Sequence, residues 1–232
     1  MLQTVLEAGV DGVLTGVPFL RAFDLLLYQY DATRIATLDQ LHDSTIPGRQ
    51  EGAEIHQQIF SPHNAAAAGA DAVKIALVYG RKNTDTLATN LEFVAAIGSE
   101  CREIDLPLII EPTLWRQRLD DEFDGDLLAD AARVAFEMGA DVLKCPYPGS
   151  DEFAPLVDNI PLPVYIAGGP AVETDREVFE MVAGAHDAGG LGVMFGRNIR
   201  QRDDPAIITE ALSSIVHDGA TVDQATEVVG SQ

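Results

Sequence analysis

Two of the three lysines of this chain stand at matching places in a repeated pattern. Lys74 follows Gly69 by five residues and Lys144 follows Gly139 by five residues, each inside a short apolar run. A charged side chain in such a run is costly to bury unless it faces a polar cavity or a partner. Burial and a neighbouring cation both lower the pKa of an ammonium group, which favours the neutral amine that a Schiff base requires. The alternative is a lysine pair that only packs against a carboxylate.

An acidic residue stands at the end of the apolar run between the two lysines. This run covers residues 107–111, and Pro112 follows it, so we expect a strand that ends at Glu111. There the Glu111 carboxylate would lie between the two ammonium groups and could relay protons. The alternative role of Glu111 is that of a counter-ion with no catalytic duty.

Glycines follow the last two apolar runs of the chain. Gly168 and Gly169 come after residues 163–167, and Gly196 is followed directly by Arg197. The ends of the last two strands of a barrel commonly bind phosphate, and exposed backbone N–H groups together with an arginine suit a phosphate dianion. The alternative is that these glycines only form tight turns.

Four other side chains follow expected strands. Asp39 and His42 lie just past the second strand, where they could touch substrate or form hydrogen bonds within a loop. Trp115 and Tyr147 could line a pocket or cap the core. None of the five histidines has the spacing of a metal ligand, and no G-x-G-x-x-G follows the first strand, so neither a metal nor a cofactor is predicted.

Extended and helical segments alternate along the chain. At four places an expected helix ends at a glycine, followed by a tight turn and an apolar strand; these glycines are Gly9, Gly69, Gly139 and Gly189. Three further strands are expected at residues 34–38, 107–111 and 163–167, and the clearest helices at about 84–104, 125–138, 173–187 and 204–216. Continuous apolar strands between helices are typical of parallel sheets, so we predict an α/β fold, a TIM-type (β/α)8 barrel.

The expected strands number seven rather than eight. The chain opens in a helix over residues 2–8, which in a barrel should follow a first strand. We therefore expect either a barrel that lacks its first strand or a start codon placed too far downstream. Residues 1–232 are expected to form one domain, with about 217–232 as a C-terminal helix and a loose end. A barrel rim next to a missing strand would favour a homo-oligomer.

The charge balance narrows the classes of partner. Fifteen Lys and Arg residues against 37 Asp and Glu residues give a net charge of −22, which excludes a nucleic-acid binder and argues against binding to an anionic membrane surface. Without an apolar run of about 18 residues or a signal peptide, and with only two cysteines, we predict a cytoplasmic protein with reduced thiols. An acidic, lysine-poor chain indicates a high-salt cytoplasm; an acidic mesophilic protein is the alternative.

Several stretches together resemble the class I, Schiff-base phosphosugar aldolases. Residues 69–74, 98–101 and 107–111 are most similar to tagatose-1,6-bisphosphate aldolases, and residues 139–144, 167–170 and 193–199 to archaeal-type fructose-bisphosphate aldolases of the wider deoxyribose-phosphate aldolase superfamily. The resemblance covers about residues 5–216. It implies that Lys144 forms the Schiff base, that Lys74 is its electrostatic neighbour and that Glu111 shuttles protons, while the glycines and Arg197 hold phosphate.

The chain departs from this family at two places. The first strand of the family supplies an acidic residue to the site, and that strand is absent here. The fructose-bisphosphate branch also has an acid/base tyrosine after its fifth strand, where residues 111–117 read EPTLWRQ.

From these observations we predict a metal-independent lyase of carbohydrate metabolism, a class I aldolase that cleaves or forms a carbon–carbon bond in a phosphorylated ketose such as fructose 1,6-bisphosphate. A related Schiff-base synthase of the aminodideoxyheptulosonate type is one alternative. A phosphate-binding barrel without a Schiff base, for instance an isomerase, is another, and an inactive relative is the third.

Overall fold

The computed structural model describes residues 1–42 and 55–230, and its centre is a curled sheet of parallel strands. Seven strands follow one another in the order β1-β2-β5-β6-β7-β8-β9, and every neighbouring pair is parallel. Their bounds are β1 Gly12–Gly16, β2 Thr33–Thr37, β5 Ala72–Tyr79, β6 Leu108–Leu114, β7 Val142–Cys145, β8 Val164–Ala167 and β9 Gly192–Met194. The predicted α/β architecture of barrel type is confirmed, with seven strands in the sheet of the described residues.

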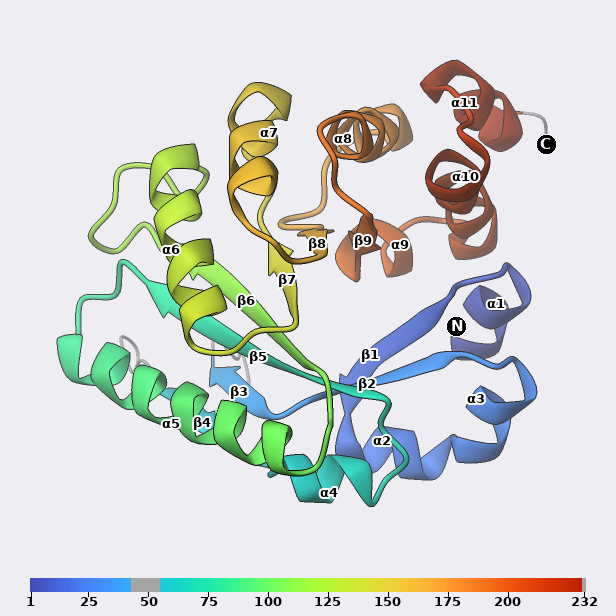
Figure 1. The fold of residues 1–232 in the computed structure, drawn as a ribbon. Helices are drawn as coiled ribbons and strands as arrows, with labels where there is room; N and C mark the ends of the chain where they lie inside the picture. The colour runs from blue at the N-terminus through green and yellow to red at the C-terminus, as the bar shows by residue number, and fades with distance from the viewer. Residues whose placement is uncertain (43–54, 231–232) are drawn as a thin grey trace.

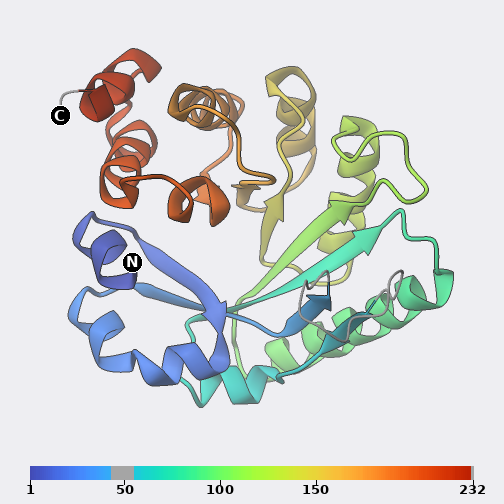
Figure 2. The ribbon, with the colours of Figure 1, turned by 180° about the vertical axis from the view of Figure 1, so that it is seen from behind.

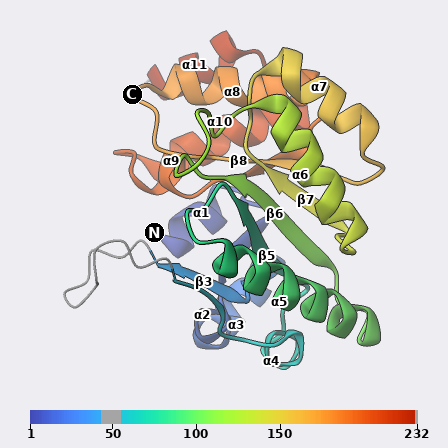
Figure 3. The same ribbon diagram turned by 90° about the vertical axis from the view of Figure 1, so that its left-hand side faces the viewer.

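Helices surround the outer face of the sheet (Figure 1), and the view from behind in Figure 2 shows the same ring. They are α1 Leu2–Glu7, α2 Val17–Ala22, α3 Asp24–Gln29, α4 Pro62–Ala66, α5 Thr84–Glu103, α6 Gly125–Glu137, α7 Ser150–Asn159, α8 Asp175–Asp187, α9 Arg197–Arg200, α10 Pro205–Asp218 and α11 Val222–Gly230. In the side view of Figure 3, α5 and α6 lie over β5 and β6, against which they pack. None of the helices in the described part of the chain is long and apolar enough to cross a membrane.

The repeated glycine is explained by its backbone conformation. Gly9, Gly69, Gly139 and Gly189 each end a helix with a positive φ, between 79° and 95°. Side chains other than glycine are strained in this left-handed region, so glycine lets the chain turn sharply from helix to strand.

An aspartate in two of the repeats fixes the register of the following strand. The Asp71 carboxylate accepts a hydrogen bond of 2.8 Å from Arg34 N, and the Asp141 carboxylate accepts one of 2.8 Å from Leu108 N. Each aspartate thus ties the start of its own strand to the neighbouring strand, three residues before a lysine. The two lysines are therefore carried by strands that begin in the same way.

The core lies between the sheet and the helices. In β5 the first seven of eight residues are buried, and the largest fully buried side chains include Ile75, Leu77, Ile110 and Leu143. Burying apolar surface contributes about 25 cal/mol per Å², so these buried strand side chains help to stabilise the fold.

The end of β6 differs from the prediction. We expected the strand to stop at Glu111, but it continues through Pro112 to Leu114. Proline is tolerated here because β7 pairs with β6 only at Ile109 and Ile110, so no ladder on that side needs the N–H that proline lacks. As a result Glu111 lies within the strand.

A two-stranded antiparallel hairpin was not expected from the sequence. It consists of β3 Asp39–His42 and β4 Ile55–Gln58, and it packs against β5 and α5. The chain leaves the main sheet after β2 to form this hairpin, which brings Asp39 and His56 next to β5.

Candidate active site

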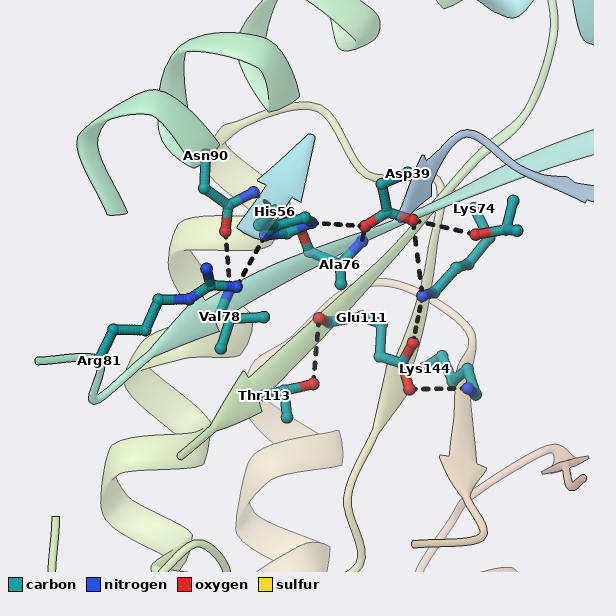
Figure 4. Close-up of polar contacts among 11 residues, drawn as sticks. Asp39, His56, Lys74, Ala76, Val78, Arg81, Asn90, Glu111, Thr113 and Lys144 are labelled. Atoms are coloured by element: carbon teal, nitrogen blue, oxygen red, sulfur yellow. Dashed lines mark hydrogen bonds and ion pairs between the residues drawn. The ribbon is translucent and has the colours of Figure 1, made fainter. Parts of the chain in front are cut away.

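The two lysines and Glu111 form one ion cluster inside the sheet. Lys74 Nζ lies 2.5 Å from Glu111 Oε2, and Lys144 Nζ lies 2.7 Å from Glu111 Oε1 (Figure 4). The three side chains are between 9% and 16% exposed. One carboxylate thus bridges two ammonium groups that come from strands on either side of its own.

The register of the strands explains why these side chains meet. Lys74 is level with Ile109 of β6, which is level with Val142 of β7. Lys144 stands two residues beyond Val142. Strands of a barrel are staggered by about one residue per strand, so an offset of two residues over two strands leaves both lysines in one layer.

The environment drives the pKa values of the two lysines in opposite directions. Burial by itself disfavours both charges. At Lys74 the nearby Glu111 and Asp39 carboxylates outweigh burial, and the pKa is raised. At Lys144 burial prevails over the attraction of Glu111, the Lys74 cation adds to it, and the pKa is lowered. The amine that gives up its proton more easily is therefore that of Lys144.

Glu111 is held in its ionised form. Burial would raise the pKa of its carboxyl group, but the ammonium groups of Lys74 and Lys144 outweigh burial and lower the pKa to about 2. At neutral pH the carboxylate can accept a proton or a hydrogen bond from either lysine.

Asp39 lies behind Lys74, with 2% of its side chain exposed. Its Oδ1 is 4.0 Å from Lys74 Nζ, and its Oδ2 accepts a hydrogen bond of 2.9 Å from Ala76 N. Burial would raise the pKa of Asp39, but Lys74, His56 and the Ala76 N–H lower it to about 2. β2 pairs with β5 only as far as Lys74, so the Asp39 carboxylate, rather than a β2 carbonyl, accepts the hydrogen bond from Ala76 N of β5.

A cavity of about 430 Å³ opens beside Lys144 and Glu111. The predicted phosphate residues line it together with two residues of β6 and its following turn: Gly168, Gly169, Gly196, Arg197, Thr113 and Trp115. A Cβ added to Gly168 would come within 2.9 Å of the Phe195 ring, so the backbone approaches its neighbour as only glycine allows. The sequence did not decide whether Trp115 and Tyr147 line a pocket or cap the core. Trp115 lines this cavity.

Asn198 is a residue that sequence reasoning missed. It is fully buried, donates hydrogen bonds to Gly168 O and Pro170 O at 2.6 and 3.3 Å, and accepts one from Val172 N at 3.0 Å. Its side chain ties the loop after β8 to the segment after β9 and so fixes both glycine segments. Asn198 directly follows Arg197, and this position in the sequence could have identified it as a site residue.

The remaining expected site residues lie elsewhere. Tyr147 packs edge-on against Phe153, and its hydroxyl is 2.7 Å from Ser150 Oγ, so it caps the core between α7 and α8. The side chain of His42 lies outside the described part of the structure. Within residues 1–42 and 55–230, no three His, Cys, Asp or Glu side chains gather as a metal ion would require.

Comparison with known proteins gives the family. The chain is 40% identical over 163 residues to a class 1 fructose-bisphosphate aldolase of Halobacterium salinarum, covering 69% of this chain and 60% of that protein. It is 38% identical over 168 residues to 2-amino-3,7-dideoxy-D-threo-hept-6-ulosonate synthase of the same species, covering 72% and 62%. The chain thus spans about three fifths of the length of these relatives.

A solved structure agrees with these relatives. It is that of a Schiff-base-forming fructose-1,6-bisphosphate aldolase, with a TM-score of 0.80 and 28% identity, and the match covers 93% of this chain and 82% of that one. The family model for DeoC/LacD aldolases matches residues 3–202. The chain belongs to the DeoC/LacD family of aldolases.

Proposed function

We propose that this chain is the barrel of a class I aldolase that cleaves or forms a carbon–carbon bond in a phosphorylated ketose, with fructose 1,6-bisphosphate as the substrate. The observation that carries the proposal is a partly buried lysine of lowered pKa, Lys144, held 2.7 Å from an ionised glutamate at the wall of a cavity. The names of the relatives support the substrate class.

The reaction begins at the Lys144 amine. The neutral nitrogen attacks the C2 carbonyl of the open-chain ketose, and the carbinolamine loses water to give an iminium ion. A lowered pKa raises the fraction of amine that is ready to attack at neutral pH. The glycines and Arg197 would hold the phosphate and so orient C2 toward Lys144.

Bond cleavage uses the iminium ion as an electron sink. A base removes the proton of the C4 hydroxyl, the C3–C4 bond breaks, and its electron pair forms an enamine while the aldehyde leaves. Protonation of the enamine at C3 and hydrolysis then release dihydroxyacetone phosphate and restore the amine.

Glu111 and Lys74 have distinct roles in this scheme. Glu111 is ionised at rest, so it first acts as an acceptor toward Lys144 and donates only after it has taken a proton. Lys74 keeps its charge, because two carboxylates face it, and its cation disfavours a second charge on Lys144.

Borohydride trapping tests this proposal. Reduction in the presence of fructose 1,6-bisphosphate should attach the sugar phosphate to Lys144, which peptide mass mapping locates; the exposed Lys82 serves as an internal control. The Lys144→Arg variant should lose both the adduct and the cleavage activity. An adduct on Lys82 alone, or full activity in Lys144→Ala, contradicts the mechanism, and the second result would favour a barrel without a Schiff base.

A synthase that transfers a triose unit to another acceptor is the second candidate. The 38% identity to the hept-6-ulosonate synthase supports it. Both reactions pass through the same Lys144 adduct, so trapping does not separate them. Release of glyceraldehyde 3-phosphate from fructose 1,6-bisphosphate, without any added acceptor, supports the aldolase, whereas turnover that requires an acceptor supports the synthase.

A further inference from the structure

A line of buried polar contacts leads away from the two lysines and takes no part in the steps above. Asp39 Oδ1 lies 4.0 Å from Lys74 Nζ, His56 Nε2 lies 2.7 Å from Asp39 Oδ2, and Arg81 Nη2 lies 2.8 Å from His56 Nδ1 (Figure 4). Counted over the whole residue, backbone included, Asp39, His56 and Arg81 are 6%, 3% and 3% exposed. Polar groups buried to this degree are expensive unless each is bonded to the next.

The direction of these hydrogen bonds is fixed by Arg81. A guanidinium group only donates, so His56 Nδ1 must accept from Arg81, and the ring proton is on Nε2, which donates to Asp39. The guanidinium of Arg81 also lies over the Trp115 ring, 4.7 Å from its centroid. The imidazole therefore has one tautomer and one orientation, set by a side chain that is itself held in place.

These contacts leave the Asp39 carboxylate little freedom to rotate. Oδ2 accepts from His56 and from Ala76 N, and Oδ1 accepts from Thr37 Oγ1 at 3.0 Å. Oδ1 is thereby the oxygen that faces Lys74.

We infer that His56, with Arg81 behind it, is a positioning residue that holds the Asp39 carboxylate toward Lys74 and so keeps a positive charge beside Lys144. The inference rests on the proposed function, in which Lys144 is the reactive amine. Asp39 is the second anion that offsets the cost of burying the Lys74 charge, and that charge in turn disfavours the protonated form of Lys144. His56 thus acts on Lys144 through Asp39 and Lys74.

Two variants of His56 separate positioning from packing. In His56→Gln the amide nitrogen reaches the place of Nε2 and can still donate to Asp39. In His56→Asn the shorter amide reaches only the place of Nδ1, so it keeps an acceptor for Arg81 and loses the donor to Asp39. Both variants replace the aromatic ring by an amide and lose its edge-on contact with Phe93.

The measurement is the pH dependence of labelling by trace acetic anhydride, read by peptide mass spectrometry as Lys144 relative to the exposed Lys82. The charged groups that act on Lys144 are Glu111, Lys74 and Asp39. With Asp39 released, Lys74 is more often neutral, so the curve of Lys144 should move to higher pH in His56→Asn, with a severalfold loss of labelling at pH 7. His56→Gln should retain the curve of the unmodified chain.

Equal curves in both variants, whether shifted or unshifted, overturn the inference, since a purely structural role predicts equal behaviour. If His56→Asn does not fold, Arg81→Met takes its place: it removes the group that fixes the tautomer and should shift the Lys144 curve in the same direction, and an unshifted curve overturns the inference. This labelling needs no sugar phosphate. Failure of borohydride trapping would therefore count against the proposed function alone.

Discussion

The middle of the sheet and its two outer strands bury their residues very differently. Seven of the eight residues of β5 are buried, whereas all five residues of β1 and all three of β9 are half-buried. In the middle, Lys74 and Lys144 each contact Glu111, and the outer strands are separated by a cavity of about 790 Å³ with largely apolar walls.

Lys144 connects the two regions, because it lines both this larger cavity and the smaller one beside Glu111. Charged groups are thus accommodated where the sheet provides neighbours on both sides, in agreement with the rule that buried charges need partners. The outer strands carry no such charges on their facing walls and leave apolar side chains in contact with the cavity. We therefore expect the two regions to respond differently to the same kind of substitution.

The largest difference is expected from truncating one leucine in each region. Leu143 of β7 is fully buried, so Leu143→Ala should lower the free energy of unfolding by about 2–5 kcal/mol. Leu14 of β1 is half-buried and already faces the larger cavity, so Leu14→Ala should cost less than about 1 kcal/mol. Urea unfolding measures both values. Equal losses would mean that the wall between β1 and β9 is packed as tightly as the middle of the sheet.

The sequence predicted the middle of the sheet better than its surroundings, for a physical reason. The glycine turn, the aspartate and the lysine lie within six residues of one another, so local spacing determines how each lysine strand begins. His56 and Arg81 are 25 residues apart and meet only because the chain leaves the sheet after β2 to form the hairpin. No local sequence pattern predicts that the chain leaves the sheet there. Pro112 indicated the end of a strand, but the strand continues to Leu114.

The next effect is expected from acid. Asp39 and Glu111 have pKa values lowered to about 2 in the folded chain, against ordinary values near 4. A lowered folded pKa gives stability that is complete above the unfolded pKa and is lost as the pH falls through the folded one. Each carboxylate should contribute about 2–3 kcal/mol, lost between about pH 4 and pH 2.

Thermal unfolding as a function of pH measures this loss. Asp39→Asn and Glu111→Gln should each flatten the dependence between about pH 4 and pH 2. The exposed carboxylate of Asp130 provides the matched control, because Asp130→Asn should leave the slope unchanged. An unchanged slope in both buried variants would show that acid unfolding is governed by other groups.

A smaller effect is expected from neutralising Lys74. Lys74→Met removes the cation that helps to lower the pKa of Lys144, so the acid limb of the kcat/KM profile should move to higher pH. In the proposed reaction, turnover of fructose 1,6-bisphosphate at pH 7 should fall on the order of 10²-fold, the range for loss of one group in acid–base chemistry. Lys82→Met is the control that removes an exposed lysine. A limb that moves to lower pH would mean that Lys74 acts on Lys144 in some other way.

Salt should produce the smallest effect and should act on the surface more than on the ion cluster. A net charge of −22 repels itself, and salt at about 1 M shortens the screening length to about 3 Å, so Tm should rise between dilute buffer and molar KCl. Near the sequence pI of about 4.3 the repulsion is small, and the rise in Tm should nearly vanish. The Lys144 labelling curve should hardly move with salt, because Lys74 and Lys144 each lie within hydrogen-bond distance of Glu111 and all three side chains are little exposed. A Lys144 curve that depends on salt, together with a constant Tm, would contradict this expectation. It would mean that solvent ions act on the ion cluster more than on the surface.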